Sequence, residues 1–256
     1  MAEKIDRKQL KRPDEFQVVA GKAMEWVAAR QRQVTLGVGA FIVLALAAWA
    51  LSGWRSSREA KAGAALSEAV ELESRPIAGE GPAQPGQETF PSKEERTKAA
   101  LAALEKVHAE HGATTTAGAT ALAEIGFLKL KSGDAAGAQK DLADFLGAAA
   151  KDHPLRPFAQ ESLGYAFEAA GKLDEARAGF EKLREMDMPA RADYHAARLS
   201  LMQNKPDAKQ QLERITKEYP KETEVVRAAN ERLELASLPP VQPGAAPETP
   251  QAKKKK

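Results

Sequence analysis

The chain has 256 residues, of which 43% are apolar, 5% aromatic and 29% charged, and its formal net charge is only +2. It has no cysteine, which excludes a lipid-modified cysteine, a thiol nucleophile and disulfides. The small net charge hides an asymmetry, because residues 1–33 carry a net +3 and the last four residues +4, so the part between them sums to about −5. This mildly acidic middle argues against nucleic acid as a partner, since phosphate binding needs a basic face.

Residues 1–32 form a polar N-terminal segment that precedes a long apolar run. After Asp14 and Glu15, the apolar residues Phe16, Val19 and Ala23 follow helical spacing. Two interpretations fit this pattern. One is a short amphipathic helix on a membrane surface, and the other is an extension of the following helix with one apolar side.

The next segment, 33–54, contains 22 residues without a single charge and lies between Arg32 and Arg55. As a helix it is about 33 Å long, which is enough to cross a hydrocarbon core of about 30 Å. Trp49 and Trp54 stand near its end, where indole rings favour the lipid–water interface. The segment therefore predicts a transmembrane helix. The alternatives are a buried helix of a soluble domain, or a signal peptide cleaved after Ala50, which would release the remainder.

Basic residues give the expected orientation of this span. Lys and Arg tie at three each within 20 residues of its two ends, but eight occur in residues 1–33 against four in residues 55–87. Since positive charge is retained in the cytoplasm, the sequence predicts a cytoplasmic N-terminus with the bulk of the chain across the membrane.

Beyond the span, residues 56–74 read as a helix, and the prolines and glycines of 75–91 predict a flexible insertion. Helix resumes at Ser92, which forms a capping-box pattern with Glu95.

A three-residue pattern then recurs through the rest of the chain. An alanine is followed four residues later by a large apolar residue, and by another after three more. The four sets are Ala100/Leu104/Val107, Ala138/Leu142/Phe145, Ala176/Phe180/Leu183 and Ala208/Leu212/Ile215. Such spacing places a small and two large side chains on one helical face, and the alanine permits close approach of a neighbouring helix. Turn sequences precede the last three sets, at 132–134, 171–174 and 204–207.

This pattern resembles tetratricopeptide repeats, which carry a Leu-Gly pair and an aromatic residue on a first helix and an alanine and an aromatic residue on a second. The best unit contains Leu163-Gly164, Phe167, Ala176, Phe180 and Pro189. The resemblance implies an all-α fold, with an N-terminal transmembrane helix followed by a tetratricopeptide-repeat-like α-solenoid over residues 55–236. Residues 221–236 are expected to cap it, and 237–256 to be a disordered Pro/Ala-rich tail that ends in a lysine run. A generic helical bundle is the alternative.

The sequence offers little for catalysis. It has no glycine-rich loop of the kind that cradles phosphate and no pair of histidines with metalloprotease spacing. His108 and His111 are one helical turn apart, but two ligands do not make a metal site, and a helix C-terminus favours histidines without any metal. We therefore expect no enzyme activity, no cofactor and no small-molecule substrate. The lysine run is expected to solubilise the chain, with anionic lipid or RNA as an alternative contact.

Taken together, the acidic start with Trp26 before the span, the Gly53-Trp54-Arg55 ending and the alanine-rich repeats resemble the bacterial ancillary Sec translocon subunit family. Members are single-span inner-membrane proteins whose solenoid faces the periplasm and which associate with the translocon and with periplasmic chaperones. The resemblance implies a non-enzymatic protein that assists exported polypeptides on the periplasmic side. The alternatives are a scaffold for another envelope complex and a released periplasmic repeat protein.

A binding surface is expected on the first helices of the repeats. By the register of Gly126 and Gly164, the inward positions are Phe127, Leu130, Phe158, Glu161, Tyr165 and Glu168. Rings beside carboxylates suit peptides that carry apolar and basic side chains. In the alternative interpretation, Phe127 and Phe158 are ordinary packing between repeats and only the glutamates reach water.

Overall fold

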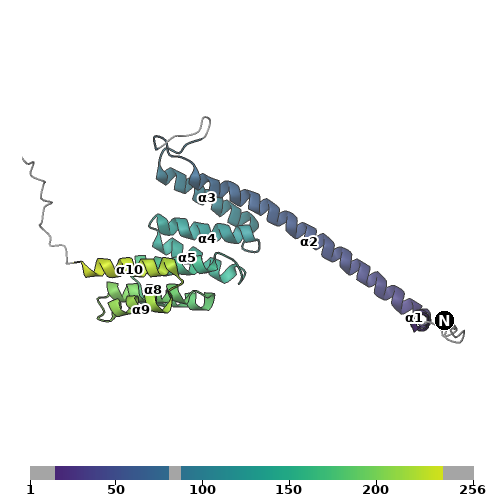
Figure 1. Ribbon diagram of the computed structural model, residues 1–256. Coiled ribbons are helices and arrows are strands. Elements are labelled where there is room, and N and C mark those ends of the chain that lie inside the picture. Colours follow the sequence, from purple (N-terminus) through teal and green to yellow (C-terminus); the bar gives the residue numbers. More distant parts are fainter. Residues whose placement is uncertain (1–14, 81–87, 239–256) are drawn as a thin grey trace, which may run out of the picture. The chain divides into compact units, whose positions relative to one another are not determined.

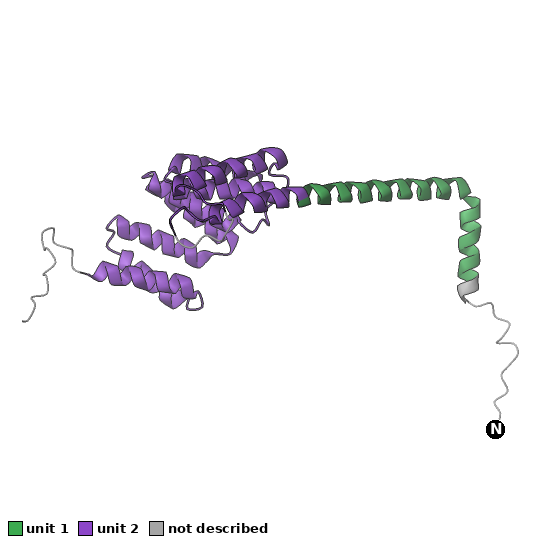
Figure 2. Cartoon of the chain, turned by 90° about the horizontal axis from the view of Figure 1, so that it is seen from above, with its two compact units in different colours: residues 1–60 green, residues 61–256 purple. Residues whose placement is uncertain are grey.

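The computed structural model describes residues 15–80 and 88–238 (Figure 1). Residues 1–14, 81–87 and 239–256 lie outside the described residues. They include the start of the N-terminal segment, part of the 75–91 insertion and the tail that ends in lysines, so the predictions for these parts stay predictions. The described chain is all-helical apart from one isolated bridge between Ile77 and Phe90. It divides into an N-terminal unit, residues 1–60, and a C-terminal unit, residues 61–256 (Figure 2).

The N-terminal unit contains α1 (Glu15–Ala29) and most of α2 (Gln31–Ser74). α1 ends one residue before α2 begins, and Arg30 between them donates its N–H to the carbonyl of Val27 at 3.1 Å. α1 is therefore a separate helix and not an extension of the apolar helix. α2 is long and apolar enough to span a membrane, and none of its most apolar stretch is buried.

α2 is also longer than the sequence suggested. The separate helices expected at 33–54 and 56–74 form one continuous 44-residue helix. No proline interrupts residues 31–74, and isolated glycines such as Gly53 are tolerated within a helix. The helix ends at Ser74, just before Arg75 and Pro76, because a proline disfavours helical geometry in the residue before it.

The C-terminal unit consists of the end of α2 and eight further α-helices with one short 3-10 helix among the described residues. They are α3 (Lys93–His111), α4 (Thr116–Lys131), α5 (Ala135–Ala148), α6 (Arg156–Ala169), α7 (Leu173–Glu181), η2 (Lys182–Met186), α8 (Pro189–Met202), α9 (Ala208–Glu218) and α10 (Thr223–Ser237). From α3 onward each α-helix packs against the next one in the chain, and α4 also contacts α6 as α8 contacts α10. Figure 1 shows α3, α4 and α5 as successive layers of this unit.

Capping side chains and turn glycines set several of the helix ends. Ser92, Thr115 and Asp134 each accept a backbone N–H at the start of a helix, which satisfies a donor that the helix itself leaves unpaired. Gly133 and Gly171 adopt φ of +90° and +74° in the turns that follow α4 and α6, a conformation that costs glycine little.

Hydrogen bonds and an ion pair join the two ends of the 75–91 insertion. The amide of Ala78 donates to the carbonyl of Phe90 at 2.8 Å, and the amide of Phe90 donates to that of Pro76 at 3.0 Å. Arg75 and Glu88 form an ion pair between the same two ends at 2.7 Å. The two ends of the insertion are thus joined where they leave the helices.

The recurring small-and-large pattern forms the core. All twelve residues of the four aligned sets are buried, with exposed fractions of 0–4%. Leu183, the last large residue of the third set, lies on η2 and not on α7, yet it is fully buried. The pattern therefore identified the core residues even where the helix type changes.

Two glycines allow the paired helices to approach closely. A Cβ placed on Gly126 would lie 2.6 Å from Leu142, and one placed on Gly164 would lie 2.5 Å from the ring of Phe180. The ring is 1% exposed and cannot move aside freely. By contrast, a Cβ on Gly147 of α5 would meet nothing within 4 Å.

We predict that Gly164→Ala destabilises the C-terminal unit by about 1–3 kcal/mol, because the added methyl group overpacks the contact with Phe180. Gly147→Ala is the matched control, and it should be neutral or stabilising by up to about 1 kcal/mol since alanine is the better helix former. Urea unfolding of a 61–256 fragment, followed by circular dichroism, measures both. Equal midpoints for the two variants would contradict the close approach at Gly164.

Candidate functional site

The structure separates the six predicted binding residues into distinct environments. Phe127 and Leu130 of α4 are half-buried and pack against the core cluster that contains Leu142, Phe145 and Leu163. Phe127 therefore packs as in the alternative interpretation given for it. Phe158 of α6 does not, because its side chain is 47% exposed.

The other three residues, Glu161, Tyr165 and Glu168, lie on the same face of α6, at spacings of four and three residues. Phe158 stands one turn ahead of them on that face. Opposite them, α8 presents Arg191, His195 and Arg198 with the same spacing. We refer to these six side chains as the α6–α8 ladder.

Ion pairs and hydrogen bonds join the two sides of the ladder. Arg191 Nη1 donates to Glu161 Oε2 at 2.7 Å, and His195 Nε2 lies 2.8 Å from Glu161 Oε1. Arg198 donates from both Nη atoms to the two carboxylate oxygens of Glu168, each at 2.6 Å. This bidentate geometry is the strongest that arginine forms with a carboxylate.

Aromatic rings fill the middle of the ladder. His195 stacks on Phe180 with ring centroids 4.0 Å apart, and Tyr165 meets both rings edge-on at 5.2–5.3 Å. The guanidinium of Arg198 lies 5.1 Å from the centroid of the Tyr165 ring, a cation–π arrangement. Tyr165 still exposes 37% of its surface. The ladder thus joins the core contact at Phe180 to a partly exposed aromatic surface.

Burial governs the charge state of the ladder. Burial, together with the charge of Arg198, lowers the pKa of His195 although neighbouring Glu161 opposes this, so the imidazole is neutral near pH 7. Burial by itself raises the pKa of Glu161, but the hydrogen bond from His195 and the charge of Arg191 outweigh it and leave that pKa below its ordinary value. The neutral imidazole therefore donates from Nε2 to an ionised Glu161. Its Nδ1 has no hydrogen-bond partner among the residues that the structure describes.

The sequence interpretation missed the α8 half of the ladder. Arg191, His195 and Arg198 lie 30–34 residues beyond the glutamates that they contact. Two patterns with the same spacing would have found them. One is the acidic–aromatic–acidic pattern of α6, and the other is the basic–histidine–basic pattern of α8. The consequence for the predicted site is direct, because the carboxylates that were expected to orient a basic peptide are already paired within the chain.

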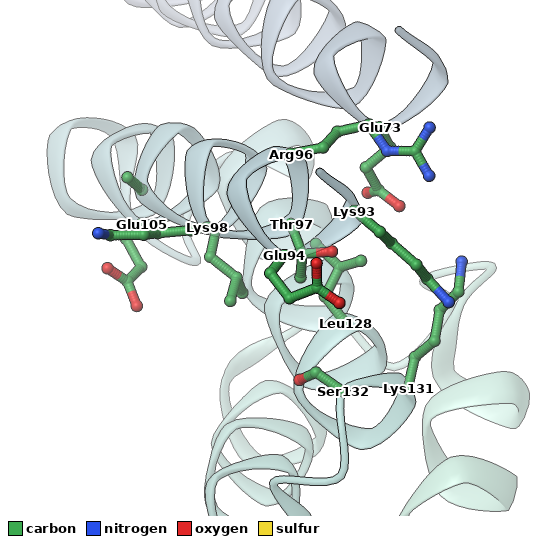
Figure 3. A pocket seen from close by; sticks show the side chains of 12 residues that line it. Glu73, Lys93, Glu94, Arg96, Thr97, Lys98, Glu105, Leu128, Lys131 and Ser132 are labelled. Carbon is green, nitrogen blue, oxygen red and sulfur yellow. The ribbon is translucent and has the colours of Figure 1, made fainter. Parts of the chain in front are cut away.

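A cavity of about 730 Å³ is the second candidate site, formed where the end of α2, the start of α3 and the end of α4 meet. Figure 3 shows charged side chains of both signs around it, among them Glu73, Lys93, Arg96 and Lys131. Burial raises the pKa of Glu73, although Lys131 and Arg96 partly oppose this. Burial also raises the pKa of Glu124, and the charge of Glu73 adds to that effect. Because its charges are mixed and mostly exposed, the cavity selects no single class of ligand.

Metal ligands do not gather anywhere in residues 15–80 and 88–238, where no group of three or more His, Asp or Glu side chains is placed to hold an ion. His108 and His111 lie in the last turn of α3, as expected, and His108 Nδ1 is 3.0 Å from the carbonyl of Gly118. His153 contacts the hydroxyl of Thr120 and the amide of Leu155. These histidines join neighbouring segments of the fold.

Comparisons with known protein families, curated proteins and solved structures found no match to this chain. The family resemblance therefore remains a prediction that rests on the residues quoted for it.

We predict that Arg198→Met destabilises the C-terminal unit by about 3 kcal/mol, because it leaves Glu168 unpaired in a site where its side chain is only 17% exposed. Adding Glu168→Leu should restore most of the loss, since the buried charge is then removed. Arg214→Met, which breaks the exposed pair with Glu218, is the control and should have little effect. A double variant no more stable than Arg198→Met would contradict this account of the ladder.

We also predict that the protein loses stability as the pH falls from 7.5 to 5.5. Folding lowers the pKa of His195. Below about pH 6.5 the imidazole therefore binds a proton in the unfolded chain but not in the folded chain. The loss attributable to this residue is at most about 1.4 kcal/mol per pH unit, the slope for one proton. The lowered pKa of Glu161 stabilises the fold, and this contribution is lost only at more acidic pH. His195→Gln should flatten the pH dependence of the unfolding midpoint, whereas His111→Gln should keep it; identical slopes would refute the assignment.

Proposed function

We propose that this chain is a membrane-anchored, non-enzymatic protein-interaction protein. In this proposal α2 crosses the bacterial inner membrane with the N-terminus in the cytoplasm. The helices beyond it form a tetratricopeptide-repeat-like α-solenoid that assists exported polypeptides at the periplasmic side of the Sec translocon. The observation that carries the proposal is the unburied apolar stretch of α2, which leads directly into helices that pack successively on one another.

The anchor is supported by the side chains of the expected span. Phe41, Leu44 and Trp49 expose 69–76% of their surfaces, and no other described segment covers them. Large apolar side chains in water are costly, so a lipid environment accounts for their exposure. Arg58 lies 5.0 Å from the centroid of the Trp54 ring, and an indole beside a cation suits the headgroup region just past the span.

The solenoid is supported by the packing order. From α3 onward each α-helix contacts the next in the chain, and contacts between alternate helices occur at α4–α6, at α8–α10 and, through the ladder, at α6–α8. The close glycine contacts recur at equivalent places, Gly126 on Leu142 and Gly164 on Phe180. Repeated units that bury their faces only by stacking form extended binding surfaces.

Protein is favoured as the partner because of what the α6 face presents. With Glu161 and Glu168 paired to α8, the exposed groups are the rings of Phe158 and Tyr165. Aromatic side chains contribute large contact area at low entropic cost and are enriched where proteins bind one another. The proposed ligand is therefore an apolar segment of a polypeptide, and the requirement for basic side chains is withdrawn.

Protease accessibility in spheroplasts tests the orientation. We predict that protease added outside intact spheroplasts digests the chain beyond Trp54 and leaves an N-terminal fragment that contains α1. A cytoplasmic protein and a periplasmic protein, each followed in the same sample, control for leakage and for protease activity. Survival of the C-terminal unit until the membrane is lysed would overturn the periplasmic placement.

Purification of the native protein in mild detergent, with partners identified by mass spectrometry, tests the proposed partners. Translocon subunits, periplasmic chaperones or exported chains should be recovered with the parent protein and reduced by Phe158→Ser. Phe158 is suited to this test because it is half-exposed and its replacement leaves the ladder intact. Consistent recovery of another envelope complex instead would favour the scaffold alternative.

A further inference from the structure

The apolar side chains of α1 are not needed for the proposed anchor or the proposed binding face, and they expose a large surface. Val19, Met24 and Trp26 are exposed by 66%, 75% and 54%. We propose that α1 lies along the membrane surface as an interfacial helix, and that its partner is the headgroup region of a bilayer containing anionic phospholipid. The inference rests on the proposed function in one respect, namely that α2 spans the membrane.

The apolar side chains of α1 form one continuous face. At 100° per residue, the arc from Trp26 through Val19 and Val27 to Met24 covers about 160° of the helix, and alanines fill the space between them. Lys22 and Glu25 lie outside this arc. Val18 is the one large apolar residue on the polar side. A helix of this kind places one face in the acyl boundary and the other in water.

The position of α1 in the chain determines which surface it meets. Only Arg30 separates it from α2, and the uncharged run of α2 begins at Gln33. The amide of Val34 donates to the carbonyl of Arg30 at 3.0 Å, so α2 is already helical as it leaves the turn. The C-terminal end of α1 therefore lies within a few residues of the hydrocarbon boundary. Figure 2 shows α1 turned away from the axis of α2 within the N-terminal unit, as a helix lying along the surface requires.

The charges beside α1 favour anionic lipid. Lys22, Arg30 and Arg32 are the basic residues between 18 and 32, against the single acidic Glu25. The guanidinium of Arg30 lies 5.1 Å from the centroid of the Trp26 ring, which places an indole and a cation together at the end of the helix nearest the span. Indole rings settle at headgroup level, and lysine and arginine next to a membrane are attracted to anionic lipid.

Tryptophan fluorescence in the full-length protein tests this placement. Trp49→Phe with Trp54→Phe leaves only Trp26, and Trp26→Phe with Trp54→Phe leaves only Trp49 in the span. Each protein is reconstituted into vesicles of phosphatidylcholine and phosphatidylglycerol that contain lipid brominated either near the headgroup or near the chain end. We expect Trp26 to be quenched mainly by the shallow bromines, whereas Trp49 reports independently on the span.

The outcomes separate this inference from the proposed function. Quenching of Trp49 with no quenching of Trp26 would overturn the interfacial helix and place α1 in water or on protein, while the anchor stands. Strongest quenching of Trp26 by the deep bromines would also overturn it, because α1 would then be inserted. If neither tryptophan is quenched, both the anchor and this inference fail.

The anionic preference has its own test. In vesicles of phosphatidylcholine alone, and with Lys22→Glu plus Arg30→Glu in the mixed vesicles, shallow quenching of Trp26 should fall about twofold or more. Lys61→Glu, an exposed charge beyond the span, is the control and should leave it unchanged. Equal quenching in all four samples would overturn the role of anionic lipid.

Discussion

The close approach of paired helices at Gly126 and Gly164 is the constraint on which the core depends. Because glycine has no side chain, Leu142 and Phe180 lie directly against the backbone of the preceding helix. The aligned alanines and large apolar residues are buried around these contacts. The ladder depends on the same contact. The ring of Phe180 on α7 lies against Gly164 of α6 and stacks on the imidazole of His195 of α8. The packing of α6 against α7 therefore positions the polar contacts to α8.

The contact between α6 and α8 is largely polar, whereas the contact between α4 and α6 is apolar. Phe127, Leu130 and Phe167 contribute apolar packing around α4 and α6, whereas α6 and α8 are joined by paired charges and a neutral histidine. Ion pairs at low exposure contribute less net stability than apolar packing of the same volume, but they are costly to break singly. They therefore favour one alignment of the two helices over alternatives that would leave a charge unpaired. The exposed parts of Phe158 and Tyr165 are the aromatic groups that this face presents to another molecule.

The sequence was most informative where one helix reveals its own environment. The spacing of Ala176, Phe180 and Leu183 identified buried residues because periodicity reports which side of a helix faces the core, and Ser92 caps a helix as the sequence indicated. It was least informative where the outcome depends on two distant segments. Glu161 and Glu168 read as exposed carboxylates because nothing local shows Arg191 and Arg198 opposite them. Likewise, the break at Arg30 and the continuity of α2 past Trp54 depend on backbone geometry that no single residue type dictates. The stacking as a solenoid, the membrane and the partner remain proposals.

Photo-crosslinking in the native envelope tests the central claim, that this is an anchored protein which binds polypeptides through the face of α6. A photoreactive amino acid is placed at Phe158, on that face, and in a second protein at Arg214, an exposed position on α9. The account predicts crosslinks from position 158 to translocon subunits, chaperones or exported chains, and few from position 214. Equal crosslinking from the two positions, or none from position 158 while the protein stays folded and in the membrane, would contradict it.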